Sequence, residues 1–300
     1  MGKIAGFIGL GQMGLPMARC LDRAGFEVRV FDLDPSASLG WEGPEISVVA
    51  TMAEAAQPSD IVFLCLPGVK QVQAAVLDPD GLVTSLRPGA LLVDCGTTEY
   101  GFTVDLAATL SEKGFRFLDA PVSGMAERAW LGELTVMVGG AVRDFEEALP
   151  FLQAFGREVV YMGPTGSGQL AKLINQLLFN VSLAALAEVL PLAAKLGLDP
   201  DRVERVINTG TGQSFASSHF VPGILENRFD RGYSLAAAYK DMESAAGIMN
   251  RLKYEMPVVQ AATATYQAAL AMGLGQEDKG AMVKVHEEKL GVRFRSGSGN

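Results

Sequence analysis

The sequence predicts an α/β protein in which an N-terminal domain with a doubly wound parallel sheet is followed by an all-helical C-terminal domain. Short apolar segments alternate with helical patterns as far as residue 163, and a glycine-rich turn joins the first segment to the first helix. After residue 163 only helical patterns follow. We therefore place one domain at residues 1–163 and the other at residues 164–300. With 300 residues and 49% hydrophobic content, the chain can bury both cores.

The first strand is joined to the first helix by the glycine-rich turn. Residues 3–8 read as a short buried strand, GLGQMG follows, and a helical pattern continues to about residue 24. In this context G-x-G-x-x-G is typical of a Rossmann-type site, where glycines allow a tight turn, backbone approach to a pyrophosphate and close helix packing. The helix N-terminus favours negative charge. We expect a dinucleotide to bind at Gly9, Gly11, Gln12, Met13 and Gly14.

The second strand, at residues 27–31, is followed directly by Asp32. This carboxylate stands eighteen residues past Gly14, close to the roughly 20 expected for the acid that binds the adenosine ribose hydroxyls. An acid at this position repels a 2'-phosphate, so the sequence predicts NAD as the cofactor in preference to NADP. The alternative is that Asp32 is only a turn residue after a strand.

Further strands are predicted at residues 61–66, 90–94, 115–119, 134–138 and 158–161. In a doubly wound sheet ligands sit beyond the carboxyl ends of the strands, so the residues that follow each strand are candidate ligand-binding positions. Three such loops are small and turn-forming, at residues 66–68, 95–98 and 120–124. On this ground Leu66 is a candidate cofactor-binding residue, although ordinary loop chemistry explains any one of these loops equally well.

The C-terminal domain begins with a glycine-rich turn that leads into a helix carrying one lysine, GPTGSGQLAKLINQ at residues 163–176. Lys172, Asn175 and Gln176 stand three and four positions apart and share one helix face. Most positions from 170 to 196 are apolar, so an ordinary solvated face explains this polar group poorly. A lone lysine near a helix start is nevertheless usually a surface charge.

Hydride transfer at a carbinol carbon requires a group that moves a proton at the oxygen. The chain has no Tyr-x-x-x-Lys motif, no readable His-Asp pair and no zinc-ligand set. Lys172 remains, because burial disfavours the ammonium form of a lysine and lets it exchange a proton near neutral pH. We predict Lys172 as the general acid and base, with Asn175 holding the hydroxyl.

Composition and charge exclude several other classes of protein. The net charge is −9 and there is no Lys/Arg-rich run, which argues against a nucleic-acid or anionic membrane surface. No apolar run approaches the roughly 20 residues of a spanning helix, and the N-terminus carries no charged leader, so we expect a cytoplasmic chain without a membrane partner. The cysteines and histidines are isolated, which favours core residues over a disulfide framework or metal site: Cys20, Cys65, Cys95, His219 and His286.

These motifs together resemble the beta-hydroxyacid dehydrogenase family, the group that contains 3-hydroxyisobutyrate dehydrogenase. Four blocks carry the resemblance over nearly the whole chain: GFIGLGQMGLPMARCL from residue 6, DAPVSG from residue 119 with LTVMVGG from residue 134, GSGQLAKLINQ from residue 166, and YKDMESA from residue 239. The resemblance implies an N-terminal dinucleotide domain and a homodimer or homotetramer built through the helical domain. A partner subunit is also favoured by the first long helix, whose apolar residues extend nearly all round it.

The resemblance implies that Lys172 is catalytic with Asn175 in support. It also implies that Ser123 and Gly124 bind the substrate carboxylate. The residues it places near the nicotinamide are Pro67, Thr97 and Lys240, and Lys240 would further favour the neutral form of Lys172 as a second nearby cation.

Two residues depart from the usual family pattern. The family usually reads DAPVSGG, whereas this chain has Met125 in place of the second glycine, and Gly96 replaces the serine usual before Thr97. A methionine beside the carboxylate site narrows or reshapes it, so we include Met125 among the substrate-binding residues.

The sequence therefore predicts an NAD-dependent dehydrogenase or semialdehyde reductase that acts on a small 3-hydroxy or 4-hydroxy carboxylate. Two alternatives stay open. Imine reduction is performed by similar folds, but typically without the lysine, and a non-catalytic dinucleotide-binding protein would tolerate the loss of Lys172. Decarboxylation of 6-phosphogluconate is disfavoured because 300 residues cannot hold the extended helical domain of that branch.

Overall fold

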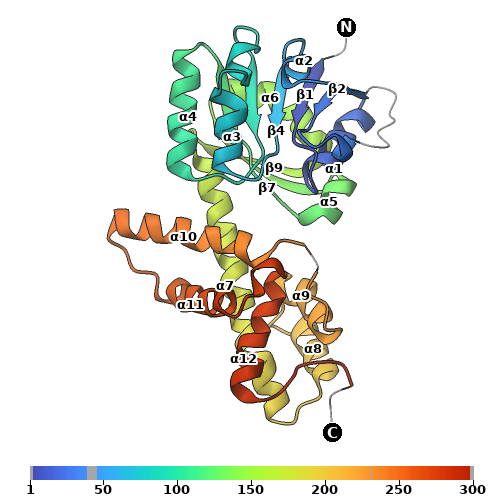
Figure 1. Cartoon of the computed structure of the whole chain (residues 1–300), viewed down its shortest axis with the longest axis vertical. Helices are drawn as coiled ribbons and strands as arrows, with labels where there is room; N and C mark the ends of the chain where they lie inside the picture. The colour runs from blue at the N-terminus through green and yellow to red at the C-terminus, as the bar shows by residue number, and fades with distance from the viewer. Residues whose placement is uncertain (1–2, 39–45, 231, 298–300) are drawn as a thin grey trace. The chain divides into compact units, whose positions relative to one another are not determined.

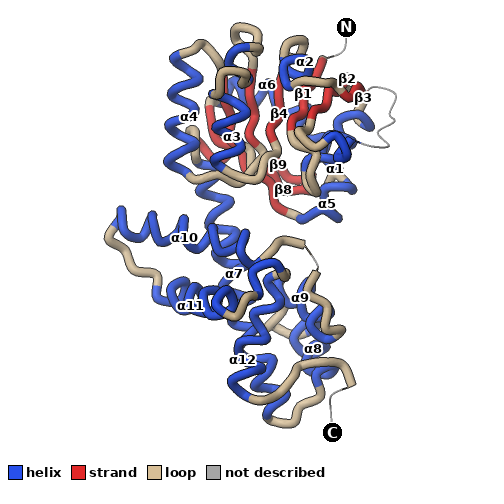
Figure 2. The backbone as a smooth tube through the Cα atoms, in the orientation of Figure 1, coloured by secondary structure: helices blue, strands red, loops and turns tan. Residues whose placement is uncertain are grey.

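The structure is a computed structural model that describes residues 3–38, 46–230 and 232–297. The chain divides into two compact units, Met1–Lys172 and Leu173–Asn300, and the division falls inside a helix that begins at Ser167 (Figure 1). Strands occur in the first unit, whereas the described part of the second consists of helices and loops (Figure 2). The α/β class with a helical C-terminal region is thus confirmed.

The N-terminal unit alternates strands and helices along the chain. Its strands are β1 (Ile4–Ile8), β2 (Glu27–Phe31), β3 (Ile46–Val48), β4 (Ile61–Leu64), β5 (Leu91–Asp94), β6 (Arg116–Asp119), β7 (Val122–Ser123), β8 (Leu134–Gly140) and β9 (Gly156–Gly163). Its helices are α1 (Gly14–Arg23), α2 (Met52–Ala56), α3 (Val69–Leu77), α4 (Tyr100–Glu112), α5 (Met125–Leu131) and α6 (Val142–Phe155), with 3-10 turns η1 (Pro35–Ser38) and η2 (Leu82–Thr84).

The sheet follows the order β3-β2-β1-β4-β5-β6-β8-β7, with β9 beside β8. The first six strands are parallel, and their order reverses between β1 and β4, as in dinucleotide-binding sheets. One strand departs from the predicted parallel arrangement: β8 runs antiparallel to both β6 and β7. The segment between β7 and β8 is shorter than the dozen or so residues that a parallel crossover needs, so the chain returns antiparallel.

Both faces of this sheet are covered by helices, which explains why its strands are apolar on both sides. Along β4, Phe63 packs in a core with Phe155 of α6, whereas its neighbours Val62 and Leu64 pack in a second core with Leu110 of α4. All five side chains are at most 1% exposed. The sheet is therefore a rigid layer whose strand ends can hold loops in fixed positions.

The C-terminal unit is built from α7 (Ser167–Lys195, which starts in the first unit), α8 (Pro200–Thr209), α9 (Phe215–Leu225), α10 (Leu235–Leu252), α11 (Pro257–Ala271) and α12 (Val283–Leu290), with 3-10 turns η3 (Leu274–Gln276) and η4 (Lys279–Met282). Its core gathers Leu183 and Leu190 of α7 with Phe220 of α9 and Tyr266 of α11.

The sequence led us to expect no helix long and apolar enough to span a membrane, and α7 differs from that expectation. It has 29 residues, and its most apolar stretch reaches a mean hydropathy of 1.9, so by length and composition it could cross a membrane. The core helices of soluble proteins meet the same criterion, and 39% of this stretch is buried in the structure. The residues of α7 that pack in the helical core account for that burial.

Candidate active site

The glycine-rich loop between β1 and α1 has the shape that a pyrophosphate site needs. Gly9 adopts φ of 95°, a left-handed conformation that favours glycine, and a Cβ at this position would overlap the carbonyl oxygen of Cys65. A Cβ at Gly14 would overlap the carbonyl oxygen of Gly9, whereas at Gly11 it would meet nothing within 4 Å. Gly9 and Gly14 are thus required by packing, and the Gly11 backbone faces open space from which a phosphate can approach.

Helix α1 starts without the groups that usually neutralise a helix N-terminus. Met13 stands at its N-cap position and makes no side-chain capping bond, and no acidic residue lies in the first turn. Gln12, just before it, is exposed. The partial positive charge of this helix end is therefore available to an anion.

Asp32 lies beside the same loop, directly after β2. One of its carboxylate oxygens accepts the backbone N–H of Leu10 at 2.6 Å, and the other accepts that of Asp34 at 2.8 Å. Each oxygen keeps a further lone pair that can accept a hydroxyl donor. Asp32 therefore holds the glycine-rich loop to the end of β2 and can still bind a sugar hydroxyl.

The loops after β4 and β5 lie against each other at this end of the sheet. A Cβ on Gly9 would come within 2.9 Å of the Leu66 side chain, and one on Gly96 would come within 2.9 Å of the Leu66 carbonyl oxygen. A side chain at position 96 would therefore require these two loops to move apart. Pro67 and Thr97, the next residues of the two loops, are both exposed.

Lys172 is buried on the first turns of α7, with 8% of its surface exposed. Its Nζ donates a hydrogen bond to the carbonyl oxygen of Val122 at 2.9 Å. Val122 directly precedes Ser123, so the lysine amine is tied to the loop that the resemblance assigns to the substrate carboxylate. Lys172, Ser123 and Gly124 are thus brought together within the N-terminal unit.

Met125 has an unusual backbone conformation. Its φ is 62°, in the left-handed region where glycine is favoured, and it follows Gly124, whose φ is 142°. The position where the family usually has glycine is therefore one where glycine fits the backbone better. Left-handed residues other than glycine cluster at functional sites, which makes Met125 a residue to test in substrate selection.

The structure contains a buried polar network that the sequence analysis missed. Asp94, Asp119 and Gln169 are at most 3% exposed. The Asp94 carboxylate accepts the N–H of Gly96 at 2.9 Å, and that of Asp119 accepts the N–H groups of Gly166 at 2.7 Å and Gln169 at 2.9 Å. Burial raises the pKa of Asp94 to about 6 and also raises that of Asp119, although the backbone donors oppose both shifts.

One signal in the sequence could have identified these acids. Asp94 and Asp119 are the last residues of the apolar strands LLVD and RFLD, so each carboxylate lies at the end of a buried segment. An acid in such a place is buried unless the chain turns outward at once. The hydrogen-bond donors of Asp119, however, lie far away in the sequence and could not be predicted from it.

Two predicted site residues belong to the C-terminal unit. Asn175 is exposed on α7 and donates to Gln176 at 3.4 Å, and Gln176 in turn donates to Asp241 of α10 at 3.1 Å. Lys240 is the exposed neighbour of Asp241. The roles of Asn175 and Lys240 stay predictions.

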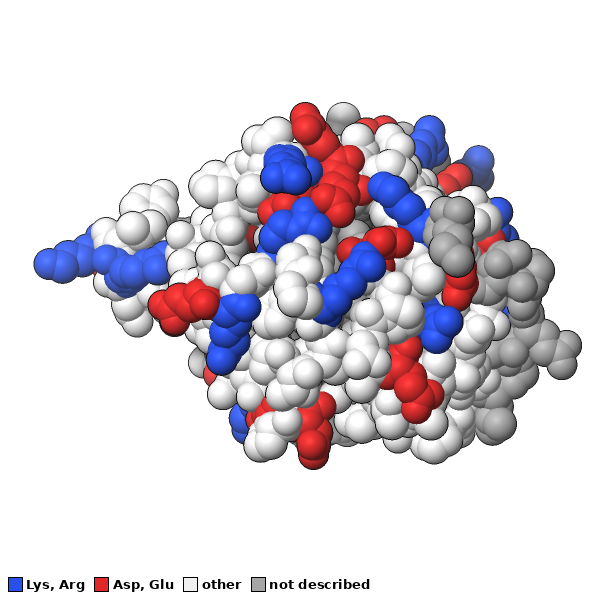
Figure 3. Space-filling model, turned by 90° about the horizontal axis from the view of Figure 1, so that it is seen from above, with Lys and Arg blue, Asp and Glu red and all other residues white. Residues whose placement is uncertain are grey.

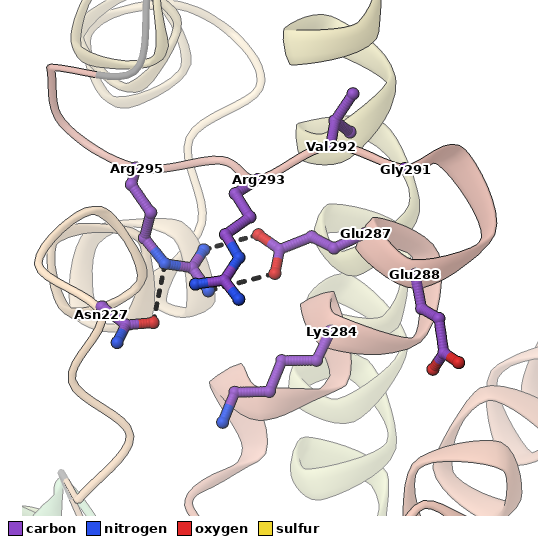
Figure 4. A pocket seen from close by; sticks show the side chains of 8 residues that line it. All are labelled: Asn227, Lys284, Glu287, Glu288, Gly291, Val292, Arg293 and Arg295. Atoms are coloured by element: carbon purple, nitrogen blue, oxygen red, sulfur yellow. Dashed lines mark hydrogen bonds and ion pairs between the residues drawn. The ribbon is translucent and has the colours of Figure 1, made fainter.

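A groove in the C-terminal unit is a structural feature and not a candidate active site. It has a volume of about 740 Å³. Figure 4 shows Arg295 directed at the carboxylate of Glu287, with Nη2 at 3.0 Å from it, and Lys284 is paired with Glu277. The Arg295–Glu287 pair and the bond from the Phe294 N–H to Glu287 at 2.9 Å hold the C-terminal segment against α12.

The described residues were compared with two other kinds of site, a metal centre and a basic binding face. Within residues 3–38, 46–230 and 232–297, no group of three or more His, Cys, Asp and Glu side chains could hold a metal ion. On the face drawn in Figure 3, acidic and basic side chains are interspersed without an extended basic patch.

Comparison with known proteins covers both units. A family model described as the NAD binding domain of 6-phosphogluconate dehydrogenase matches residues 4–163. A second, described as NAD-binding of NADP-dependent 3-hydroxyisobutyrate dehydrogenase, matches residues 166–286. Together they account for most of the chain.

Individual relatives are similar over most of their lengths. The chain is 34% identical to 2-(hydroxymethyl)glutarate dehydrogenase of Eubacterium barkeri, over 97% of both chains. It is 32% identical to the mitochondrial 3-hydroxyisobutyrate dehydrogenase of Homo sapiens, over 91% of this chain and 83% of that one. The crystal structure of 3-hydroxyisobutyrate dehydrogenase from Salmonella typhimurium superposes with a TM-score of 0.87 at 29% identity, covering 94% of this chain and 99% of the other.

Proposed function

Because the chain belongs to the beta-hydroxyacid dehydrogenase family, we propose that it is an NAD-dependent oxidoreductase that interconverts a small 3-hydroxy or 4-hydroxy carboxylate and its semialdehyde. The observation that carries the proposal is the buried amine of Lys172, which is tied at 2.9 Å to the carbonyl that precedes Ser123. A buried amine beside a loop assigned to a carboxylate is suited to move a proton at the substrate oxygen.

The residues present fit a dinucleotide. The glycine-rich loop leaves open space at Gly11, the start of α1 carries no acid, and Asp32 lies beside that loop. The segment 32–45 contains acids at positions 32, 34, 42 and 45 and no lysine or arginine, so nothing in it compensates a 2'-phosphate. This charge pattern supports NAD over NADP. When bound, the dinucleotide supplies or accepts the hydride.

The protein's own contribution is to move the proton and hold the substrate. In oxidation, neutral Lys172 takes the hydroxyl proton, and in reduction the protonated lysine returns it. Asn175 holds the hydroxyl, Lys240 is a second cation that favours the neutral form of Lys172, and Ser123 with Gly124 binds the carboxylate. Thr97 and Pro67 line the nicotinamide end.

We further propose that the protein is a cytoplasmic homodimer or homotetramer assembled through its C-terminal unit. Support comes from α7, where large apolar side chains remain exposed in the single chain: Leu178 is 70% exposed, Ile174 62% and Val189 48%. Burial of such side chains against a second copy contributes roughly 1.5–3 kcal/mol each. Sedimentation analysis measures the subunit count.

The two alternatives are less well supported. Imine reduction does not require a buried lysine beside the carboxylate loop, and a dinucleotide-binding protein without catalysis does not require it either. The arrangement of Lys172 with Val122 therefore favours the hydroxyacid reaction.

The test is a panel of small hydroxy acids with NAD and semialdehydes with NADH, followed by the absorbance of the reduced nicotinamide. The Lys172→Ala variant should bind NAD nearly as tightly as the wild type while turning over on the order of a hundredfold more slowly. Lys195→Ala, which removes an exposed lysine from the other end of the same helix, is the matched control and should be unaffected. Unimpaired turnover by Lys172→Ala would overturn the proposed mechanism.

A further inference from the structure

We propose that Asp119 and Gln169 are positioning residues: Asp119 anchors the start of α7, and Gln169 clips the Thr97 loop to the helix that carries Lys172. The inference rests on the proposed function, in which Lys172 moves the proton and Thr97 lies at the nicotinamide end. It adds two buried residues whose side chains bond to the protein backbone and so fix the distance between the proposed catalytic and cofactor-binding groups.

Asp119 anchors α7 by capping it from a neighbouring strand. The first backbone N–H groups of a helix have no partner within the helix, and a carboxylate is the strongest acceptor for them. The two oxygens of Asp119 accept Gly166 N–H at 2.7 Å and Gln169 N–H at 2.9 Å, and the side chain is fully buried. A Cβ on Gly139 or Gly168 would come within 2.8 Å of these oxygens, so the carboxylate can occupy this place only because both residues are glycine.

Gln169 uses both ends of its amide on the loop that contains Thr97. Its Nε2 donates to the carbonyl oxygen of Gly96 at 2.9 Å, and its Oε1 accepts the N–H of Thr98 at 3.1 Å. The side chain is 3% exposed. Because the two bonds involve the residues on either side of Thr97, the amide holds this loop at two points and fixes its conformation.

Lys172 follows Gln169 by three positions and therefore lies on the same face of α7. Its amine is held in turn by the carbonyl of Val122. One turn of α7 thus connects the end of β6, the loop after β5 and the start of β7. Loss of the Gln169 clip would leave Lys172 on its helix but would free the Thr97 loop to shift against it.

The first test replaces the amide with an isosteric apolar side chain, Gln169→Leu. Misplacement of reacting groups by about 1 Å costs on the order of a hundredfold in rate, so kcat should fall by about that factor. The dissociation constant for NAD should change by less than about threefold, because the residues that hold the adenosine end make no bond to Gln169. Gln153→Leu, the same substitution at an exposed position of α6, is the control and should leave kcat unchanged.

A conservative variant separates positioning from mere structural support. In Gln169→Glu the protonated carboxyl can donate to Gly96 and accept from Thr98, whereas the ionised form loses the donor. Burial of position 169 and the carboxyl groups of Asp94 and Asp119 favour the protonated form, whereas Lys172 favours the ionised form only while it is itself protonated. The ratio of variant to wild-type kcat should rise by about tenfold between about pH 8 and about pH 5.5. A flat ratio overturns the inference.

Amide hydrogen exchange tests the two bonds between Gln169 and the Thr97 loop without any substrate. In Gln169→Leu the Thr98 amide should exchange at least about tenfold faster than in the wild type, while residues 9–14 keep their protection. Unchanged exchange at residues 96–98 overturns the inference whatever the activity. If the wild type oxidises no hydroxy acid of the panel, the proposed function fails, and the exchange measurement alone then decides whether the clip exists.

Discussion

Replacement of Asp94 by asparagine should change how the stability of the N-terminal unit depends on pH. Asp94 is 1% exposed, and burial raises the pKa of its carboxyl from 3.8 to about 6, against opposing bonds from Gly96 and Thr98. Because the folded pKa lies above the unfolded one, the native state keeps a proton that the unfolded chain has lost. Asp94 therefore contributes stability that is complete below about pH 4 and is lost as the pH rises through about 6.

The size of the effect follows from the two pKa values of Asp94. At 1.36 kcal/mol for each pKa unit, the rise from 3.8 to about 6 corresponds to about 3 kcal/mol in the free energy of unfolding. About half of this, ~1.4 kcal/mol, falls between about pH 5 and about pH 7.5. Asp94→Asn keeps an oxygen that can accept the Gly96 N–H but carries no titrating proton. Relative to the wild type, the variant should therefore gain ~1.4 kcal/mol over this interval.

Urea unfolding at a series of pH values measures this difference, with tryptophan fluorescence as the signal. Both tryptophans, Trp41 and Trp130, belong to the N-terminal unit and so report the unit that contains Asp94. Asp60→Asn is the control. Burial tends to raise the pKa of Asp60, but bonds from Ile4 and Arg87 hold it below its ordinary value, so its titration ends below the interval. Parallel pH curves for wild type and Asp94→Asn would refute the reasoning.

Four further predictions address the site directly. Lys172→Arg should lower kcat by on the order of a hundredfold, because a guanidinium does not release its proton near neutral pH; steady-state rates near wild type would contradict proton transfer by the lysine. Asp32→Ala with Leu33→Arg, at a position that is 87% exposed, should move the ratio of kcat/KM for NAD over NADP toward NADP, and an unchanged ratio would show that Asp32 does not contact the ribose. Met125→Gly should change relative kcat/KM among small hydroxy acids by roughly 10 to 200-fold with little change in NAD affinity; the reverse result would place Met125 in the cofactor site. Cys65 and Cys95 should resist iodoacetamide in the native protein, since burial raises the pKa of Cys65 to about 12 and that of Cys95 well above its ordinary value; rapid labelling detected by mass spectrometry would show that they are accessible as thiolates.

The parts of the fold that depend on local sequence were predictable. The strand at Glu27–Phe31 and the turn with Gly9, Gly11 and Gly14 follow from residue patterns within a few positions of each other. The direction of β8 was not predictable in this way, because the apolar run LTVMV is compatible with a parallel or an antiparallel neighbour. The choice depends on the length and course of the preceding connection.

In the candidate site, too, residues with a local sequence signal could be predicted, whereas long-range contacts could not. Lys172 could be identified from its own helix, because a polar face stood out against apolar surroundings. The hydrogen-bond partners of Asp119 and Gln169 could not be identified, since they are 47 to 73 residues away in the chain. The left-handed backbone of Met125 was also not predicted, because a methionine gives no signal in the sequence for this conformation.

At Met125, the residue that is best for folding stability differs from the residue that we expect to be best for turnover of the native substrate. A left-handed conformation costs an L-residue about 1–2 kcal/mol that glycine does not incur. In a library randomised at this position and sorted only for folded, soluble protein, Met125→Gly should be enriched over the parent. When the same library is sorted for turnover of the native substrate, methionine at position 125 should be enriched over glycine. Position 125 would then be a place where evolution kept a residue that folding alone would have discarded.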